Sequence, residues 1–214
     1  MSVRKVVTRS GKRFRGKFPS KKNRRLVEWE SLLERDALML LEYHPAVLKF
    51  EEQPSVEIYY DGGNCPHRYV PDLRVEFWDG REVVIEVKPS AHVASKEVGE
   101  KLGAIAKRME ELGRSFRVLT ELEIRSQPRF DTLQLLHSSS RRLPSLLDQD
   151  RLLRRLQGAH EWTYGTAASK LGSVEEVHRL VAARRLHINL QEPLTNDTLI
   201  WIAEEGVSND SLCF

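Results

Sequence analysis

The sequence predicts an α/β fold in which a mixed sheet is flanked by helices and followed by a small second domain. Residues 68–77 and 82–88 are apolar strands around a tight turn, which is the pattern of a β-hairpin. An amphipathic segment, 93–112, then leads to another apolar strand at about 116–120. Because a strand–helix–strand crossover makes its two strands parallel, the hairpin and the crossover together predict a mixed sheet.

The composition fits a soluble protein with a core of its own. Of 214 residues, 40% are hydrophobic and 30% are charged, which is typical of a globular chain. No apolar run approaches the roughly 18 residues of a membrane helix, and the first residues lack the apolar stretch of a secretory signal. The two cysteines, Cys65 and Cys213, give no disulfide framework. We therefore expect a cytoplasmic protein without a membrane partner.

Positive charge is concentrated at the start of the chain. Eleven of the 34 Lys and Arg residues lie in residues 1–25, which contain no acid, so the rest of the chain has a net charge of −8. A basic arm on an acidic body favours contact with phosphates, and Phe14 and Phe18 could stack on bases. A merely solvated tail is the alternative. The predicted DNA-binding residues are Arg13, Arg15, Lys17, Lys21, Lys22, Arg24 and Arg25.

The remaining elements of the first domain follow from local signals. Residues 25–43 have helical apolar spacing, and His44 ends the helix because a residue before proline avoids helical geometry. Residues 55–60 are the first predicted strand, closed by the turn sequence DGGN. Pro71 lies inside the second strand and predicts an edge or a bulge there. The resulting order of elements is α-β-β-β-α-β.

A polar segment without apolar periodicity, 137–145, separates the predicted catalytic domain (26–137) from a C-terminal domain (145–214). In the C-terminal domain, a helix, a turn at Gly172, a second helix at 174–185 and two short strands follow one another. This is the outline of a helix-turn-helix with a wing. We therefore predict a small winged-helix-like domain after the basic arm (1–25) and the catalytic domain.

Charged residues at the end of the hairpin indicate a chemical site. Glu86 and Lys88 project from one face of their strand, whereas Val87 projects from the other. If the WDG turn is a three-residue loop with Gly80 in the left-handed conformation, Asp72 stands opposite Glu86. A two-residue loop would place Asp72 opposite Val87 instead, on the wrong face.

Two facing carboxylates repel each other, and a divalent cation compensates their charge. Mg²⁺ prefers oxygen ligands and commonly takes one or two carboxylates together with phosphate oxygens. We expect Asp72 and Glu86 to bind Mg²⁺, for which Mn²⁺ can substitute, with the backbone carbonyl of Val87 as a further ligand. Lys88 would either stabilise the phosphodiester under attack or activate the attacking water, and Glu34 would complete or extend the metal site. The competing interpretation is an ion-pair patch, with Glu34 as an ordinary surface carboxylate.

The site residues fall in a recognisable set of short sequences. LERD, EEQP, PD and EVKP follow one another between about residues 30 and 125. In this combination the chain resembles the TnsA family of transposon-end endonucleases, which have the restriction-endonuclease fold. The resemblance implies that Glu34, Asp72, Glu86 and Lys88 form a nuclease site and that Gln53 supports it.

The same resemblance implies a function inside a larger assembly. The enzyme would cut the 5′ strand ends of a transposon in double-stranded DNA, beside a DDE-type transposase subunit that cuts the 3′ ends. An AAA+ ATPase regulator would contact the C-terminal domain. Two alternatives remain open: a stand-alone nuclease of the same fold in repair or defence, and a non-catalytic DNA-binding adaptor of a transposition complex.

Overall fold

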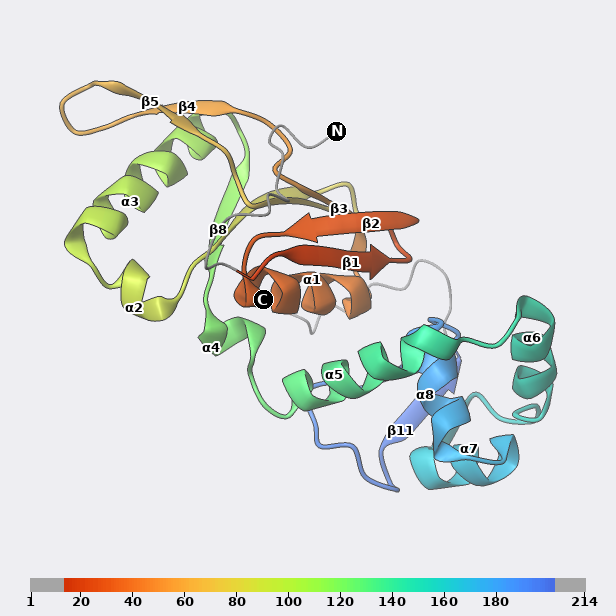
Figure 1. Ribbon diagram of the computed structural model, residues 1–214. Coiled ribbons are helices and arrows are strands. Elements are labelled where there is room, and N and C mark those ends of the chain that lie inside the picture. The colour runs from red at the N-terminus through yellow and green to blue at the C-terminus, as the bar shows by residue number, and fades with distance from the viewer. Residues whose placement is uncertain (1–13, 203–214) are drawn as a thin grey trace. The chain divides into compact units, whose positions relative to one another are not determined.

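The computed structural model describes residues 14–202, which fall into two compact units, 14–125 and 126–202 (Figure 1). Within the described range, no helix combines the length and the apolar character that crossing a membrane requires.

A four-stranded mixed sheet lies at the centre of the first unit. Its order is β3 (Val47–Glu52), β6 (Leu73–Phe77), β7 (Glu82–Val87) and β8 (Ser115–Leu119). The first two pairings are antiparallel, and β7 pairs with β8 in parallel. The crossover between β7 and β8 contains α2 (Ser90–Val93) and α3 (Lys96–Glu111), and α4 (Glu121–Ile124) follows β8. The predicted α/β fold with a mixed sheet is therefore confirmed.

The first strand of this sheet is not the predicted one. The order α-β-β-β-α-β is kept, but β3 supplies its first strand, whereas the predicted strand at 55–60 becomes β4 (Glu57–Tyr60) in a separate hairpin with β5 (Pro66–Tyr69). The predicted second strand, 68–77, is divided between β5 and β6 at Pro71. Proline has no N–H to donate to a ladder, so the chain leaves one sheet and enters another at this residue.

The start of the chain also differs from the prediction. Part of the expected arm and of the expected helix 25–43 forms a hairpin of β1 (Gly16–Ser20) and β2 (Arg25–Trp29). The alternation that buries Phe18 and Val27 has period two, so it competes with the helical spacing. Helix α1 (Leu32–Tyr43) begins only after Ser31, whose side chain accepts a hydrogen bond from the N–H of Glu34.

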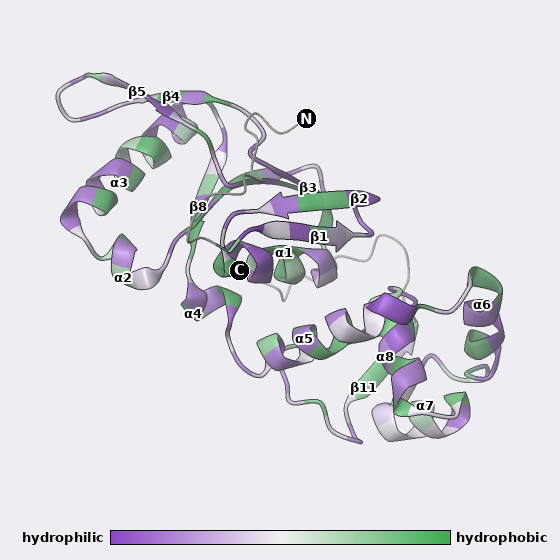
Figure 2. Cartoon of the chain, in the orientation of Figure 1, coloured by the Kyte–Doolittle hydropathy of each residue, from purple (hydrophilic) through white to green (hydrophobic). Residues whose placement is uncertain are grey.

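An apolar cluster joins the second hairpin to the crossover helix. Tyr59 and Tyr69 from the hairpin pack with Val84 of the sheet and with Ile105 and Met109 of α3. Figure 1 shows β4 and β5 running beside α3, and Figure 2 shows hydrophobic and hydrophilic residues interleaved along that helix, as a one-sided apolar face requires. The β4–β5 hairpin and α3 therefore pack together against the sheet and form one wall.

The second unit contains the helices and strands predicted for the C-terminal part, with Gly172 left-handed (φ 100°) between two of the helices. The first helix of this unit packs against the helix that follows Gly172. The division of the chain lies between Arg125 and Ser126 rather than in the polar segment 137–145. A winged-helix identity stays a prediction. The elements are α5 (Arg129–Ser139), a 3-10 turn (Ser140–Arg142), α6 (Leu146–Arg154), β9 (Glu161–Thr163), α7 (Tyr164–Leu171), α8 (Val174–Ala182), β10 (Leu186–Ile188) and β11 (Leu199–Ile202), and the three strands form a sheet in the order β10-β11-β9.

Candidate active site

The turn between β6 and β7 has the register on which the predicted site depends. The N–H of Phe77 donates to the carbonyl of Arg81 over 2.9 Å, and Gly80 has φ 83°. This is the three-residue loop, and the ladder continues to Leu73 opposite Ile85. Asp72, one residue beyond, is thus in register with Glu86, and the two-residue loop is excluded.

The structure brings Asp72, Glu86 and Lys88 together. The ammonium of Lys88 lies 2.6 Å from Glu86 Oε1 and 3.9 Å from Asp72 Oδ2. The backbone N–H of Val87 donates to Asp72 Oδ2 over 2.8 Å. Tyr69 Oη donates to Glu86 Oε2 over 2.7 Å. The two carboxylates are therefore held in place by one neighbour each, and they share one cation.

Tyr69 is the site residue that the sequence did not reveal. Its position two residues before Pro71 was the only local signal, because contact with Glu86 requires the chain to leave β5 and return through β6 and β7. Burial, followed by the charge of Glu86, raises the pKa of Tyr69, so the phenol stays protonated and donates its hydrogen bond.

The charges of the site are incompletely balanced. Burial, and next the negative charge of Glu86, raise the pKa of Asp72 to about 8, although Lys88 opposes this shift. Burial disfavours the charged form of Lys88, but the carboxylates of Asp72 and Glu86 outweigh it and raise the pKa of the ammonium. Lys88 is thus favoured in its charged form, whereas burial favours the protonated form of Asp72, and a bound cation would favour its carboxylate form.

Glu34 lies at the same cleft but has a structural task as well. Its Oε1 accepts from Ser31 Oγ over 3.0 Å, and its Oε2 accepts from the N–H of Glu30 over 2.7 Å, so it caps the start of α1. Burial raises the pKa of its carboxyl group. All four predicted catalytic residues line one open cleft with a volume of about 1050 Å³. A part for Glu34 in metal binding stays a prediction.

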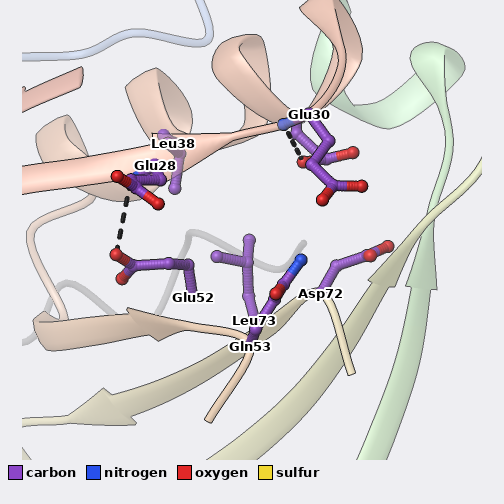
Figure 3. Close-up of a pocket in the computed structure, with 8 residues that line it drawn as sticks. Glu28, Glu30, Leu38, Glu52, Gln53, Asp72 and Leu73 are labelled. Atoms are coloured by element: carbon purple, nitrogen blue, oxygen red, sulfur yellow. Dashed lines mark hydrogen bonds between the residues drawn. The ribbon is translucent and has the colours of Figure 1, made fainter. Parts of the chain in front are cut away.

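Gln53 is placed beside Asp72. Its N–H donates to the backbone carbonyl of Asp72 over 3.0 Å, and its own φ is 44°. Among the described residues, its buried Oε1 has no hydrogen-bond partner. The side chain lies beside Asp72 in Figure 3, in a small cavity lined by Glu28, Glu30, Glu34, Leu38, Glu52, Gln53, Asp72 and Leu73. Gln53 thus touches the backbone of Asp72, and a supporting part for it in the site stays a prediction.

The donor chemistry suits a hard divalent cation. Asp72 and Glu86 offer oxygen atoms next to the backbone of Val87, and burial and the charge of Glu86 raise the pKa of Asp72 despite the nearby Lys88. In the part of the chain that the structure describes, no group of three or more His, Cys, Asp and Glu side chains is arranged to hold a metal. Mg²⁺ commonly takes one or two carboxylates together with substrate phosphates, and a cation at Asp72 and Glu86 stays a prediction.

Several residues predicted to bind DNA are engaged inside the first unit. Lys22 Nζ donates to the carbonyls of His44 and Val47, the latter over 2.6 Å. Arg25 forms a two-point ion pair with the buried carboxylate of Glu52. Lys17 lies 3.4 Å from Glu28. DNA binding by Arg15, Lys21 and Arg24 stays a prediction, and Arg13 lies outside the described residues.

Comparison with known proteins finds one family for the middle of the chain. Residues 44–121 match the family described as TnsA-like endonuclease N terminal. The matched segment contains Gln53, Asp72, Glu86 and Lys88, whereas Glu34 precedes it. No curated protein matches the chain. The resemblance to TnsA-type endonucleases is therefore confirmed over these residues, and it indicates a nuclease domain.

Proposed function

We propose that this chain is a metal-dependent DNA endonuclease that cuts the 5′ strand ends of a transposon as a subunit of a heteromeric transposase. One observation carries the nuclease activity: Asp72 and Glu86 face each other with Lys88 against both, inside the segment that matches the TnsA-like family. Facing carboxylates beside a lysine are the groups that metal-assisted phosphodiester hydrolysis requires.

In this proposal Asp72 and Glu86 hold Mg²⁺ or Mn²⁺, and the backbone carbonyl of Val87 is a third oxygen donor. A bound divalent cation would lower the pKa of a water molecule and stabilise charge on phosphorus. Tyr69 and the N–H of Val87 restrict how the two carboxylates turn, since each holds one of their oxygens. Such preorganisation lowers the cost of reaching the reactive geometry.

Lys88 is proposed to stabilise the phosphate under attack. Its ammonium is half-buried at 34% exposure, and its pKa is raised, so it keeps its charge next to a substrate anion. A divalent cation held by Asp72 and Glu86 would neutralise them, which would leave the ammonium of Lys88 available to the phosphate. Glu34 fixes the end of α1 at the cleft and would extend the metal site.

The partners of the proposed enzyme rest on the family resemblance. They are double-stranded transposon ends, a DDE-type transposase subunit, and an AAA+ ATPase regulator that docks on the C-terminal unit. A protein of this kind leaves target choice to its partners, so we expect weak or no sequence-specific cutting by the isolated chain.

The test is strand-specific cutting of a labelled transposon-end duplex with Mg²⁺ and the partner transposase present. We expect the wild type to nick the 5′ strand end and Asp72→Asn to lose at least about 1000-fold in rate, as expected when a metal ligand is lost. Glu76→Gln is the matched control, because Glu76 lies on β6 in an ion pair with Lys49, away from the cleft. Equal cutting by wild type and Asp72→Asn would contradict the proposal, as would an absence of cutting by both, which an adaptor predicts. Unspecific cutting without partners would favour a stand-alone nuclease.

A further inference from the structure

The two sides of the catalytic carboxylate Asp72 differ in charge. On one side lies the small cavity of Figure 3, whose walls include Glu28, Glu30, Glu34 and Glu52. The open cleft shares Glu30 and Glu34 with this cavity, but it also has the cations Lys88, Arg68 and Lys101, which the cavity lacks. A polyanion is therefore attracted to the part of the cleft that carries these cations and not to the small cavity.

Arg68 and Lys101 stand on one firm wall. Arg68 lies on β5, where its cross-strand neighbour is Ile58, and Lys101 lies on α3. The inward residues of the hairpin and the apolar face of α3 share the cluster built on Tyr59 and Ile105. Both cations are exposed. The positions of Arg68 and Lys101 along this wall are therefore set by the packing of β5 and α3.

Nearby carboxylates are already engaged by other cations. Glu57, at the start of the hairpin, pairs with Arg114 over 2.7 Å, and Glu100 on α3 pairs with Lys96 over 3.8 Å. Among the described residues, neither Arg68 nor Lys101 forms an ion pair with a carboxylate. Their charges are thus available to a ligand in the cleft.

We propose that Arg68 and Lys101 bind backbone phosphates of the DNA strand that is cut, on either side of the phosphate at Lys88. The strand then runs along the cleft, past the wall formed by β5 and α3, and avoids the acidic cavity beside Asp72. This inference rests on the proposed function, since it supplies the substrate path of the same site. Arginine and lysine at the rim supply affinity and position without reading sequence.

The test measures duplex binding by fluorescence anisotropy with Mg²⁺ in an Asp72→Asn background, which binds without cutting. Arg68→Ala and Lys101→Ala are compared singly and together over a range of salt concentrations. Because each lost phosphate contact lowers the slope of log affinity against log salt by about 0.9, the double variant should lose roughly 1.8. Lys107→Ala is the control, since Lys107 is an exposed cation of the same helix that does not line the cleft.

A smaller slope and weaker binding for the double variant, with Lys107→Ala unchanged and thermal midpoints equal, support the proposal. An unchanged slope in the double variant overturns it, even if the wild type cuts DNA. Conversely, a reduced slope in a protein that never cuts supports phosphate binding by Arg68 and Lys101 while the nuclease proposal fails. No duplex binding at low salt overturns both.

Discussion

Two hairpins in the first unit carry basic residues, but they use them in opposite ways. In β1–β2, two of the cations are engaged by partners within the unit: Arg25 is bound to the buried carboxylate of Glu52, and Lys22 donates to backbone carbonyls. In β4–β5, Arg68 is exposed at the cleft and is not part of an ion pair among the described residues. The number of basic residues in the sequence favours the first hairpin for DNA binding. The ion pairs that these residues form in the structure favour the second hairpin.

From this difference we expect that cations without an ion pair contact DNA more readily than paired ones. An arginine held by a buried carboxylate would have to leave that charge unpaired in order to reach a phosphate, and this costs free energy. An exposed arginine without an ion pair can contact a phosphate without leaving a carboxylate unpaired. The three predictions below test whether the first hairpin is structural and the site beside the second is functional, from the largest expected effect to the smallest.

The largest effect belongs to Lys88, the cation that contacts both carboxylates. Lys88→Ala should lower the cutting rate by about 100-fold or more, because it removes positive charge where negative charge develops. Duplex binding should change little. Lys49→Ala is the control, since Lys49 is an exposed lysine of β3 in an ion pair with Glu76. The measurement is the cutting rate with saturating duplex. A Lys88→Ala rate equal to that of the control would mean that Lys88 takes no part in the cutting reaction.

The comparison of the hairpins is sharpest for Arg25 and Arg68. Arg25→Ala should lower the free energy of unfolding by about 1–2 kcal/mol, because it leaves Glu52, whose side chain is 7% exposed, without its cation. Arg68→Ala should leave stability within about 0.5 kcal/mol, as is usual for an exposed side chain. Urea unfolding measures both. Equal effects would mean that the two hairpins do not differ as described.

The loss of stability in Arg25→Ala should depend on pH. Burial raises the pKa of Glu52, but hydrogen bonds and the charge of Arg25 outweigh it and hold the pKa below the usual value. A lowered carboxyl pKa contributes stability above the unfolded value of 4.5, and the contribution is lost as the pH falls through the folded value. The gap between wild type and Arg25→Ala should therefore shrink in acid. A gap that stays constant to low pH would exclude this ion pair as its cause.

The smallest effect concerns Asp72 without metal. Its folded pKa of about 8 exceeds the unfolded value of 3.8, so the folded state binds more protons between these values and stability falls as the pH rises through them. Asp72→Asn removes the charge and should raise the thermal midpoint by a few degrees at pH 8, with little change near pH 4. Differential scanning calorimetry in a chelator measures it. A lower midpoint at pH 8 would mean that the ionised Asp72 is stabilising.

Local signals were sufficient to predict the centre of the site. The WDG turn determines the register, so Asp72 opposite Glu86 follows from counting residues across one hairpin. The parallel pairing of β7 with β8 follows in the same way from the crossover rule.

What the sequence could not predict depends on contacts between distant segments. The strand β3 takes its place in the sheet by pairing with β6, and the residues that link the two form a hairpin of their own. The contact of Tyr69 with Glu86 and the burial of Arg25's partner Glu52 also join residues from different elements. No periodicity within a single element contains this information.

Metal binding tests the central claim most directly. Mn²⁺ is titrated into the wild type and into Asp72→Ala by calorimetry, with a transposon-end duplex present and with Glu76→Gln as the control. The account predicts binding by the wild type and the control, and loss of that binding in Asp72→Ala. Equal heats for all three proteins, at metal concentrations that saturate weak sites, would contradict it and leave Asp72, Glu86 and Lys88 as an ion-pair patch.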